Sequence, residues 1–300
     1  EVYDVGQKVF YDVFSRFGNK KVSSLPFRRI PYKEAMLKYG TDKPDLRNPL
    51  IIEDISEILA KSSFEPFKCN LARGIYVYDI NKPNSWYKSI EEYIKSIGGS
   101  GLAYIKVNSD MSFKSSIDKF LDDSLRKDLI DKCHLTPGST LFVLADTKNK
   151  IDKLAGNLRI KLGTELELID NSKYEFCIIN DFPMFEYNEE EKKWDFSHNP
   201  FSMPQGGLSA LSANNLENVL AYQYDFVCNG YEMASGAVRN HSIEIMKRAF
   251  KLAGYNEHDV ETKFKSLYTA FQYGAPPHAG MAPGIDRILM LLKDEENIRE

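Results

Sequence analysis

Apolar residues at helical spacing open the chain. Between residues 2 and 17 they recur on one side of a helix, from Val9 to Phe17, and the FGN that follows is a stop signal. The pattern predicts an amphipathic helix over residues 2–17. Because nothing before this helix supplies a surface for its apolar side, we expect further protein upstream.

The middle of the chain alternates short apolar strands with charged helices. GIYVYDI, LAYIKVN and TLFVLADT have the apolar, β-branched character of strands, whereas SIEEYIKSIG and KIDKLAGNLRIKLG have the spacing of helices. This alternation predicts a separate α+β unit over residues 64–167, inserted into a domain formed by residues 1–63 and 168–300.

After residue 176 the pattern becomes strand-rich. PMFEYNEEEKKWDF predicts a hairpin around a charged loop, and AYQYDFVCNGYEMASGAV predicts another around Asn229 and Gly230, since Asn-Gly between apolar runs is a strong hairpin signal. A Gly/Pro-rich stretch then leads into a final apolar helix. Earlier in the chain, PFRRIP is expected to be a loop that leads to a short helix from about Tyr32 to Gly40.

Composition narrows the class of protein. The 300 residues are 43% hydrophobic, yet no run approaches the roughly 18 apolar residues of a membrane-spanning helix. The N-terminus lacks a signal-peptide pattern, so a cytoplasmic location without a membrane partner is expected. The four cysteines show no CxxC spacing, which predicts free thiols, and a net charge of −4 gives no general attraction to nucleic acid.

The second hairpin is expected to bring two carboxylates together. If Asn229 and Gly230 form the turn, Val227 pairs with Glu232. Asp225 then lies diagonal to Glu232 on the same face of the sheet. Such a pair suits a divalent cation, Mg²⁺ above all, that bridges to a phosphate. The alternative is that both carboxylates face solvent.

Arg239 follows Glu232 on the second strand of this hairpin. Strict alternation puts it on the opposite face, but the small residues Ala-Ser-Gly-Ala tolerate a bulge that would return Arg239 to the acidic face. A guanidinium there could hold a substrate carboxylate through two parallel hydrogen bonds. Alternatively, it forms an ordinary ion pair with Glu232.

Two further motifs hold candidate binding residues. In HAGMAPGIDRILMLL, Gly280 and Gly284 leave the backbone open to a flat or phosphorylated ligand, and Arg287 falls in the first turn of the following helix. In HNPFSMP, His198 ends a strand and could donate to a carboxylate. Both motifs also have a purely structural interpretation: the first as a Gly-rich loop that enters a helix, the second as a structural histidine at the end of a strand.

Together these motifs resemble those of bacterial-type aspartyl-tRNA synthetases, which are class II enzymes. DFPMFE, HNPFSMPQGG, AYQYDFVCNGYEMASGAVRNH, YGAPPHAGMAPGIDRILMLL and the earlier YGTDKPDLRNP have the order and approximate spacing of that family, over essentially the whole chain. PGIDR resembles the third class II signature. The resemblance implies an α+β fold, namely part of an antiparallel-sheet catalytic domain interrupted over residues 64–167 by the bacterial-type (GAD-like) insertion domain.

The resemblance also implies roles for the candidate residues. Arg239 and His198 would bind aspartate, and Asp225 with Glu232 would bind ATP through Mg²⁺. The implied ATP site is lined by Glu232, Gly284, Ile285, Asp286 and Arg287. The implied reaction is attack of aspartate on the α-phosphorus of ATP to give aspartyl-adenylate, followed by transfer to tRNA. It works by positioning and charge stabilisation, with no protein nucleophile.

The chain departs from the family pattern in two ways. Asn199 stands where a second histidine is usual, and Met-Ala-Ser-Gly-Ala-Val fills the stretch before Arg239 where a glycine triplet and a serine are common. In addition, no match is found to the first two class II motifs or to the anticodon-binding barrel. We therefore expect the chain to be the C-terminal portion of a longer homodimeric enzyme, beginning after the second motif and inactive alone.

The expected partners are L-aspartate, ATP and the tRNA for aspartate, with the tRNA for asparagine as a second candidate that these residues do not decide. An asparaginyl or lysyl relative is a weaker alternative, because Arg239 favours an acidic substrate. A non-catalytic tRNA- or protein-binding module derived from a class II synthetase is an alternative of a different class.

Overall fold

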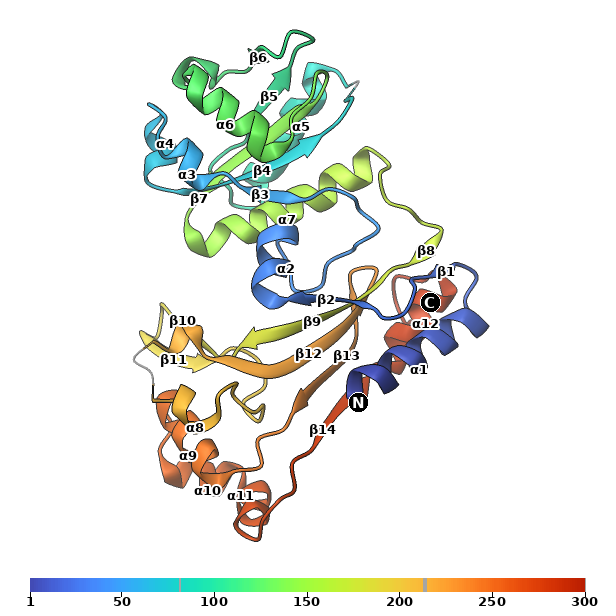
Figure 1. Ribbon diagram of the computed structural model, residues 1–300, viewed down its shortest axis with the longest axis vertical. Helices are drawn as coiled ribbons and strands as arrows, with labels where there is room; N and C mark the ends of the chain where they lie inside the picture. Colours follow the sequence, from blue (N-terminus) through green and yellow to red (C-terminus); the bar gives the residue numbers. More distant parts are fainter. Residues whose placement is uncertain (81, 213–214, 300) are drawn as a thin grey trace. The chain divides into compact units, whose positions relative to one another are not determined.

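The chain folds into two compact units. The computed structural model describes residues 1–80, 82–212 and 215–299. One unit combines Glu1–Lys33 with Ser172–Glu300, and the other is Glu34–Asn171 (Figure 1). Both units contain helices and mainly antiparallel sheets, which agrees with the predicted α+β class.

The first unit is built around a five-stranded sheet with strand order β14-β13-β12-β9-β2, antiparallel except for the pair β2–β9. Its elements are α1 (Val2–Phe17), β1 (Lys21–Val22), β2 (Arg28–Pro31), β8 (Lys173–Tyr174), β9 (Phe176–Pro183), β10 (Phe185–Asn188), β11 (Lys193–Phe196), α8 (Gly207–Ala210), η2 (Leu216–Asn218), β12 (Leu220–Cys228), β13 (Tyr231–Val238), α9 (Ile243–Leu252), α10 (Glu257–Lys263), α11 (Lys265–Gln272), β14 (Ala279–Pro283) and α12 (Ile285–Lys293).

Helices α1 and α12 cover one face of this sheet. Figure 1 shows both helices on this side of the sheet. Phe10 and Phe14 of the predicted first helix are buried in one apolar cluster with Phe226 of β12 and Ile288 of α12. Lys20, just after α1, forms an ion pair with Asp294 at the end of α12. The opposite face of the sheet is therefore the one left for polar residues.

One segment predicted as a loop is a strand. PFRRIP was expected to be a loop before the helix α2 (Tyr32–Tyr39), but Arg28–Pro31 forms β2 and pairs in parallel with β9. This prediction was wrong because the partner strand is distant in sequence, so local pattern alone could not indicate the pairing. The Gly/Pro-rich approach to the last helix also contains a strand, β14, which pairs with β13.

The second unit is a five-stranded antiparallel sheet with strand order β3-β4-β7-β5-β6 and an apolar cluster on each face. Its elements are α2 (shared with the first unit), β3 (Ile52–Asp54), α3 (Ser56–Leu59), α4 (Glu65–Lys68), β4 (Leu71–Val77), α5 (Asn84–Ser96), β5 (Ala103–Val107), β6 (Phe113–Lys114), η1 (Asp118–Phe120), α6 (Asp123–Cys133), β7 (Thr140–Asp146) and α7 (Lys148–Glu165). This compact unit runs from Glu34 to Asn171, and the pairing of β3 with β4 includes residues 52–54 in its sheet.

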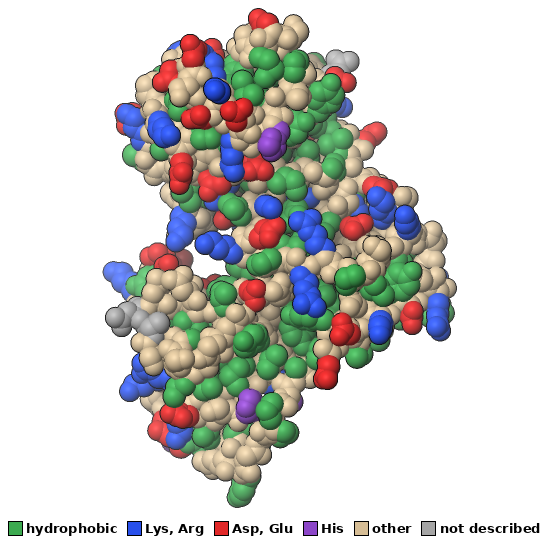
Figure 2. All heavy atoms as spheres, viewed as in Figure 1, with side chains coloured by type: hydrophobic (Ala, Val, Ile, Leu, Met, Phe, Trp, Pro, Cys, Tyr) green, Lys and Arg blue, Asp and Glu red, His purple; other side chains and the backbone are tan. Residues whose placement is uncertain are grey.

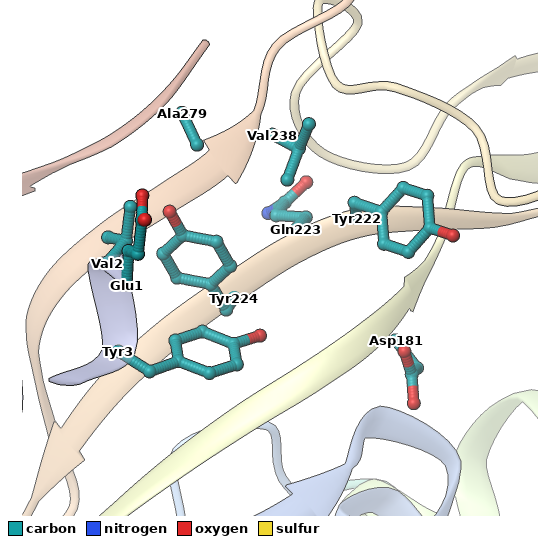
Figure 3. Close-up of a pocket in the computed structure, with 9 residues that line it drawn as sticks. All are labelled: Glu1, Val2, Tyr3, Asp181, Tyr222, Gln223, Tyr224, Val238 and Ala279. Atoms are coloured by element: carbon teal, nitrogen blue, oxygen red, sulfur yellow. The ribbon is translucent and has the colours of Figure 1, made fainter. Parts of the chain in front are cut away.

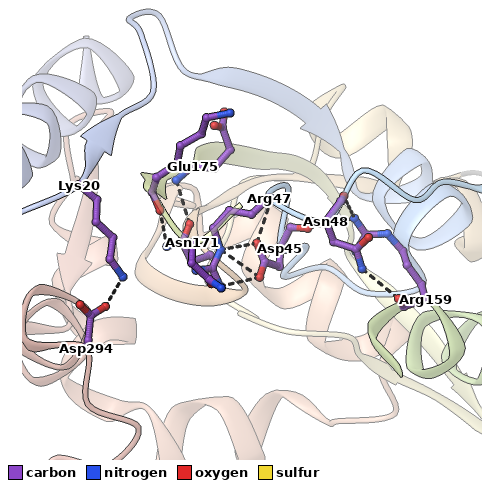
Figure 4. Close-up of polar contacts among 10 residues, drawn as sticks. Lys20, Asp45, Arg47, Asn48, Arg159, Asn171, Glu175 and Asp294 are labelled. Carbon is purple, nitrogen blue, oxygen red and sulfur yellow. Dashed lines mark hydrogen bonds and ion pairs between the residues drawn. The ribbon is translucent and has the colours of Figure 1, made fainter. Parts of the chain in front are cut away.

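A buried arginine holds the YGTDKPDLRNP segment in this unit. Arg159 of α7 is 1% exposed, and its guanidinium donates to the backbone oxygens of Leu50 (2.6 Å), Asn48 (2.6 Å) and Asp45 (3.0 Å). Asn48 Nδ2 donates in return to Arg159 O at 2.9 Å (Figure 4). Burial lowers the pKa of Arg159 to about 10. The segment is thus fixed through its backbone, which explains how a stretch without regular structure stays ordered.

The surface carries charges of both signs (Figure 2), and the four cysteines form no disulfide among the described residues. Figure 2 shows acidic and basic side chains interspersed on the viewed face of each unit. No helix among the described residues is long and apolar enough to cross a membrane. All four cysteines are free thiols, with Cys69 exposed and the other three buried.

The close approach of β13 to β14 yields a stability prediction. A Cβ added at Gly236 would lie 2.4 Å from both Gly280 O and a ring carbon of Tyr224, whereas a Cβ added at Gly280 would meet no described atom within 4 Å. We expect Gly236→Ala to destabilise the protein by about 1–3 kcal/mol through overpacking. Gly280→Ala is the matched control on the facing strand. Urea unfolding of both variants checks this, and equal stability would contradict the packing of these strands.

Candidate functional site

The β12–β13 hairpin has the predicted turn and register. Asn229 and Gly230 form the turn with φ of 51° and 87°, and the pairs Cys228–Tyr231 and Val227–Glu232 flank it. Asp225 lies two residues before Val227, so it shares a face with Glu232. This register confirms the predicted pairing of Val227 with Glu232 and places Asp225 on the same face.

A bulge is present in β13, but it falls at Met233, just before the Ala-Ser-Gly-Ala run that was expected to tolerate one. The register shifts so that Val227 pairs with Glu232 but Phe226 pairs with Ala234, which leaves Met233 as the extra residue. From there the pairs Asp225–Ser235 and Gln223–Ala237 continue the ladder. The bulge therefore returns Arg239, two residues beyond Ala237, to the face that carries Asp225 and Glu232.

Arg239 presents an available guanidinium on this face. Its side chain is half-buried, with Cζ 5.7 Å from the centre of the Phe201 ring, and its backbone N–H donates to His278 O at 2.9 Å. Among the described residues no carboxylate forms an ion pair with Arg239; the ion pair seen at Glu232 is with Arg287. The alternative of an ordinary Glu232–Arg239 pair is thus not what the structure contains.

A hollow of about 360 Å³ opens beside Arg239. Its lining includes Asn199, Ser235, Ala237, Gly280 and Arg239. This size suits a small ligand. Sequence reasoning missed Asn199 and Ser235 as lining residues, although the bulge predicted for β13 could have indicated Ser235, because it is the residue that faces Asp225.

His198 lies next to this hollow without lining it. Its exposed ring packs edge-on against Phe182 (4.9 Å between centroids) and Tyr32 (5.9 Å), and Nδ1 is 2.8 Å from Ser197 Oγ. The neighbouring Asn199 contributes to the lining instead.

The predicted nucleotide residues gather at the other end of the same strand. Gly284 caps α12 and donates its N–H to Met233 O at 2.8 Å, so the start of α12 is fixed to the bulge. Arg287, in the first turn, donates to Glu232 O at 2.9 Å and lies 3.3 Å from Glu232 Oε1. Ile285 and Asp286 are exposed beside it. This end of the face therefore combines a carboxylate, a guanidinium and an uncovered helix start.

The two carboxylates on this face differ in exposure. Asp225 is 2% exposed and the Glu232 side chain 25% exposed. Among the described residues, no group of three or more His, Cys, Asp or Glu side chains is arranged to hold a metal. Two hard carboxylate oxygens match the preference of Mg²⁺, which commonly completes its shell with phosphate oxygens and water.

The opposite face has a cavity of a different kind. A space of about 480 Å³ lies where α1 meets the sheet, with Tyr3, Tyr224 and Asp181 on its walls (Figure 3). Burial, with a smaller contribution from Tyr3, raises the pKa of Tyr224 to about 12, and its hydroxyl donates to Gly280 O at 2.9 Å. Tyr224 thus remains neutral and ties β12 to β14, which keeps the Gly280 side of the hollow in place.

Comparison with known proteins gives one family match over the whole chain. Residues 1–300 match the family model described as tRNA synthetases class II (D, K and N). Among curated proteins, the Aspartate–tRNA(Asp/Asn) ligase of Ehrlichia chaffeensis is 49% identical over 306 residues, which covers 100% of this chain and 52% of that protein. The ligase of the same name from Rickettsia bellii is 48% identical over 310 residues, covering 100% and 52%.

The chain spans about half the length of the curated relatives it matches. Among solved structures, an aspartyl tRNA synthetase from Entamoeba histolytica is 19% identical with a TM-score of 0.32, covering 77% of this chain and 42% of that one. A likeness this weak adds nothing to the fold assignment, which rests on the family match and the topology.

Proposed function

Because the chain belongs to the class II tRNA synthetases of the D, K and N group, we propose that it is part of an aspartate–tRNA ligase and carries its aspartate and ATP subsites. The observation that carries the choice of aspartate is Arg239, whose half-buried guanidinium borders a small hollow and has no ion-pair partner among the described residues. Its planar fork matches a carboxylate and faces a donor when the ligand is an amide.

The amino-acid subsite comprises Arg239 and His198. Arg239 takes the side-chain carboxylate of aspartate, and the Phe201 ring restricts the guanidinium from one side. His198 supplies a second contact from the segment that leads to Asn199. Glycine at 280 leaves room for the ligand, since no described atom lies within 4 Å of the position a Cβ would occupy there.

The ATP subsite comprises Glu232, Gly284, Ile285, Asp286 and Arg287. Asp225 and Glu232 would hold Mg²⁺, which when bound neutralises phosphate charge. Arg287 stays anchored to the Glu232 backbone and can turn its remaining donors to a phosphate or its plane to a base. Glu232 and Arg239 are roughly 20 Å apart along β13, a spacing that places the nucleotide and the amino acid end to end on one face.

The reaction follows from this arrangement. The aspartate α-carboxylate attacks the α-phosphorus of ATP, pyrophosphate leaves, and the resulting aspartyl-adenylate donates its acyl group to the terminal ribose of tRNA. Arg239 holds the aspartate by its side-chain carboxylate, so the α-carboxylate points along β13 toward the nucleotide. The residues act by orientation and charge rather than by forming a covalent bond to the substrate.

The tRNA for aspartate is the partner of this activity, and the names of the relatives, which include both Asp and Asn, support the tRNA for asparagine as a second one. We further propose a homodimer, a cytoplasmic location, and an identity of the second unit as the bacterial-type insertion domain. The alternative of a non-catalytic tRNA- or protein-binding module is less favoured, because relatives at 48–49% identity are named as ligases.

Substrate selection tests the proposal directly. We expect the full-length protein to catalyse aspartate-dependent exchange of pyrophosphate into ATP, with kcat/KM for asparagine and lysine lower by about three orders of magnitude or more, because neither offers a carboxylate to Arg239. Exchange that depends on asparagine or lysine instead would assign the chain to another branch of the family. No exchange with any of the three would favour the binding module.

A further inference from the structure

A short segment is inserted between the two strands that carry the site. Where β12 and β13 diverge, residues 199–205, here called the inserted segment, lie between them and bond to both. The backbone hydrogen bonds are Tyr222 N–H to Met203 O (2.9 Å), Gln205 N–H to Leu220 O (2.8 Å), Met203 N–H to Val238 O (2.8 Å) and Asn240 N–H to Phe201 O (2.8 Å). The segment therefore sets the spacing of the strand ends next to Arg239.

The inserted segment also contacts Arg239 itself. Ser202 pairs with Arg239 in an isolated antiparallel bridge, and the Phe201 ring lies 5.7 Å from the guanidinium carbon. At its start, Asn199 N–H donates to the buried side-chain oxygen of Gln223 at 3.3 Å. Any shift of this segment is thus transmitted to the guanidinium and to the Asn199 side of the hollow.

A carboxylate on the neighbouring strand holds the far end of the inserted segment. Gln205 Nε2 donates to Asp181 Oδ1 at 2.6 Å, and Asn180 Nδ2 donates to Asp181 Oδ2 at 2.8 Å. Bonds to an ionised acceptor are stronger than neutral ones. Figure 3 shows Asp181 on β9, next to the part of β12 that bears Tyr222 and Gln223.

The backbone of Asp181 is unusual for a strand. Its φ is 56°, in the left-handed region, at the point where the β9–β12 register shifts between Ala221–Phe182 and Tyr224–Asn180. Such a conformation costs free energy and persists only when its surroundings enforce it. The bulge turns the Asp181 side chain to Gln205, which a regular strand residue at this place would not do.

We infer that Asp181 is a positioning residue for the amino-acid subsite: through Gln205 it fixes the inserted segment, and through that segment the Arg239 guanidinium. The inference rests on the proposed function, because it concerns the residue assigned to aspartate. Asp181 does not touch the substrate, and the ATP subsite around Glu232 lies at the opposite end of β13. Its loss should therefore affect the two substrates unequally.

Swapping the hydrogen-bond donor and acceptor between Gln205 and Asp181 tests this inference. Gln205→Glu places a second carboxylate against Asp181 with almost no change of shape, so we expect KM for aspartate to rise roughly 10- to 100-fold while KM for ATP stays within about twofold. The double variant Asp181→Asn with Gln205→Glu restores one donor and one acceptor in reversed order. It should recover most of the aspartate KM.

The controls separate positioning from general damage. Glu186→Gln, which removes an exposed carboxylate from the β10–β11 hairpin, should leave both KM values unchanged. Asp181→Asn alone is the milder variant should Gln205→Glu unfold the protein, and a smaller rise confined to KM for aspartate is expected. Unchanged KM for aspartate in both variants, equal effects on both substrates, or no recovery in the double variant would overturn the inference.

Failure of the proposed function gives a different result. If the unaltered full-length protein shows no aspartate-dependent exchange, the proposed function and the positioning role fall together. If that exchange is present and selective but the Gln205 and Asp181 variants match the unaltered protein, only the positioning role is refuted.

Discussion

Replacing Arg239 by leucine is expected to lower kcat/KM for aspartate by roughly 10³- to 10⁵-fold in the full-length protein, while KM for ATP changes little. Leucine removes the guanidinium, and with it both of the hydrogen bonds proposed to the substrate carboxylate and the cation–π contact with Phe201. Pyrophosphate exchange at varied aspartate and ATP concentrations measures both quantities.

Arg239→Lys is the matched variant, because it retains the charge. It should rescue poorly, since an ammonium group cannot reproduce the planar fork. Full rescue by lysine would mean that charge alone matters at this position. A leucine variant whose KM for ATP rises while KM for aspartate stays constant would assign Arg239 to the nucleotide.

Replacing Glu232 by glutamine should abolish most aspartate-dependent exchange and leave the fold intact. The amide keeps the shape but loses the charge that would pair with Mg²⁺. Arg287 should remain in place, because it also donates to the Glu232 backbone oxygen, which the substitution does not alter. Exchange is measured beside thermal unfolding to separate the loss of charge from loss of structure.

Glu190→Gln, in the exposed charged loop of the β10–β11 hairpin, is the control for removing a negative charge. It should leave exchange unchanged. Activity of the Glu232→Gln variant within about threefold of the unaltered protein would rule out the metal and ATP role of this carboxylate.

The hairpin at the centre of the site was predictable because its signals are local. Asn229 and Gly230 fix the turn, the turn fixes the pairing of Glu232, and the small residues around Gly236 made a bulge before Arg239 plausible. Local sequence signals thus allowed two carboxylates and a guanidinium to be expected on one face, although the extra residue itself, Met233, could not be identified in advance.

The surroundings of that hairpin depend on pairings between distant segments. The strand Arg28–Pro31 pairs with β9, which follows it in the sequence only after the whole second unit. Residues 199–205 have no regular structure that a periodic pattern could indicate. In the sequence Asp181 is an ordinary polar residue of a predicted strand. Neither its left-handed backbone nor its hydrogen bond to Gln205 could be predicted from the neighbouring residues. The parallel strand, residues 199–205 and Asp181 thus surround the candidate site residues and are not themselves among them.

The same distinction applies to the second unit. Its strands and helices follow from alternation and helical spacing, but its start at Glu34 follows from the pairing of β3 with β4 and from the buried Arg159 that holds residues 45–50. An arginine in an otherwise apolar helix face gives no sequence signal for three backbone acceptors.

We propose that one face of the β12–β13 hairpin binds aspartate at Arg239 and ATP at Glu232. The most direct test is the pair of KM values, for aspartate and for ATP, measured by pyrophosphate exchange in Arg239→Leu and Glu232→Gln side by side. We predict opposite patterns, with the aspartate KM raised in the first variant and the ATP dependence impaired in the second. The same pattern in both variants would contradict the division of the face into two subsites.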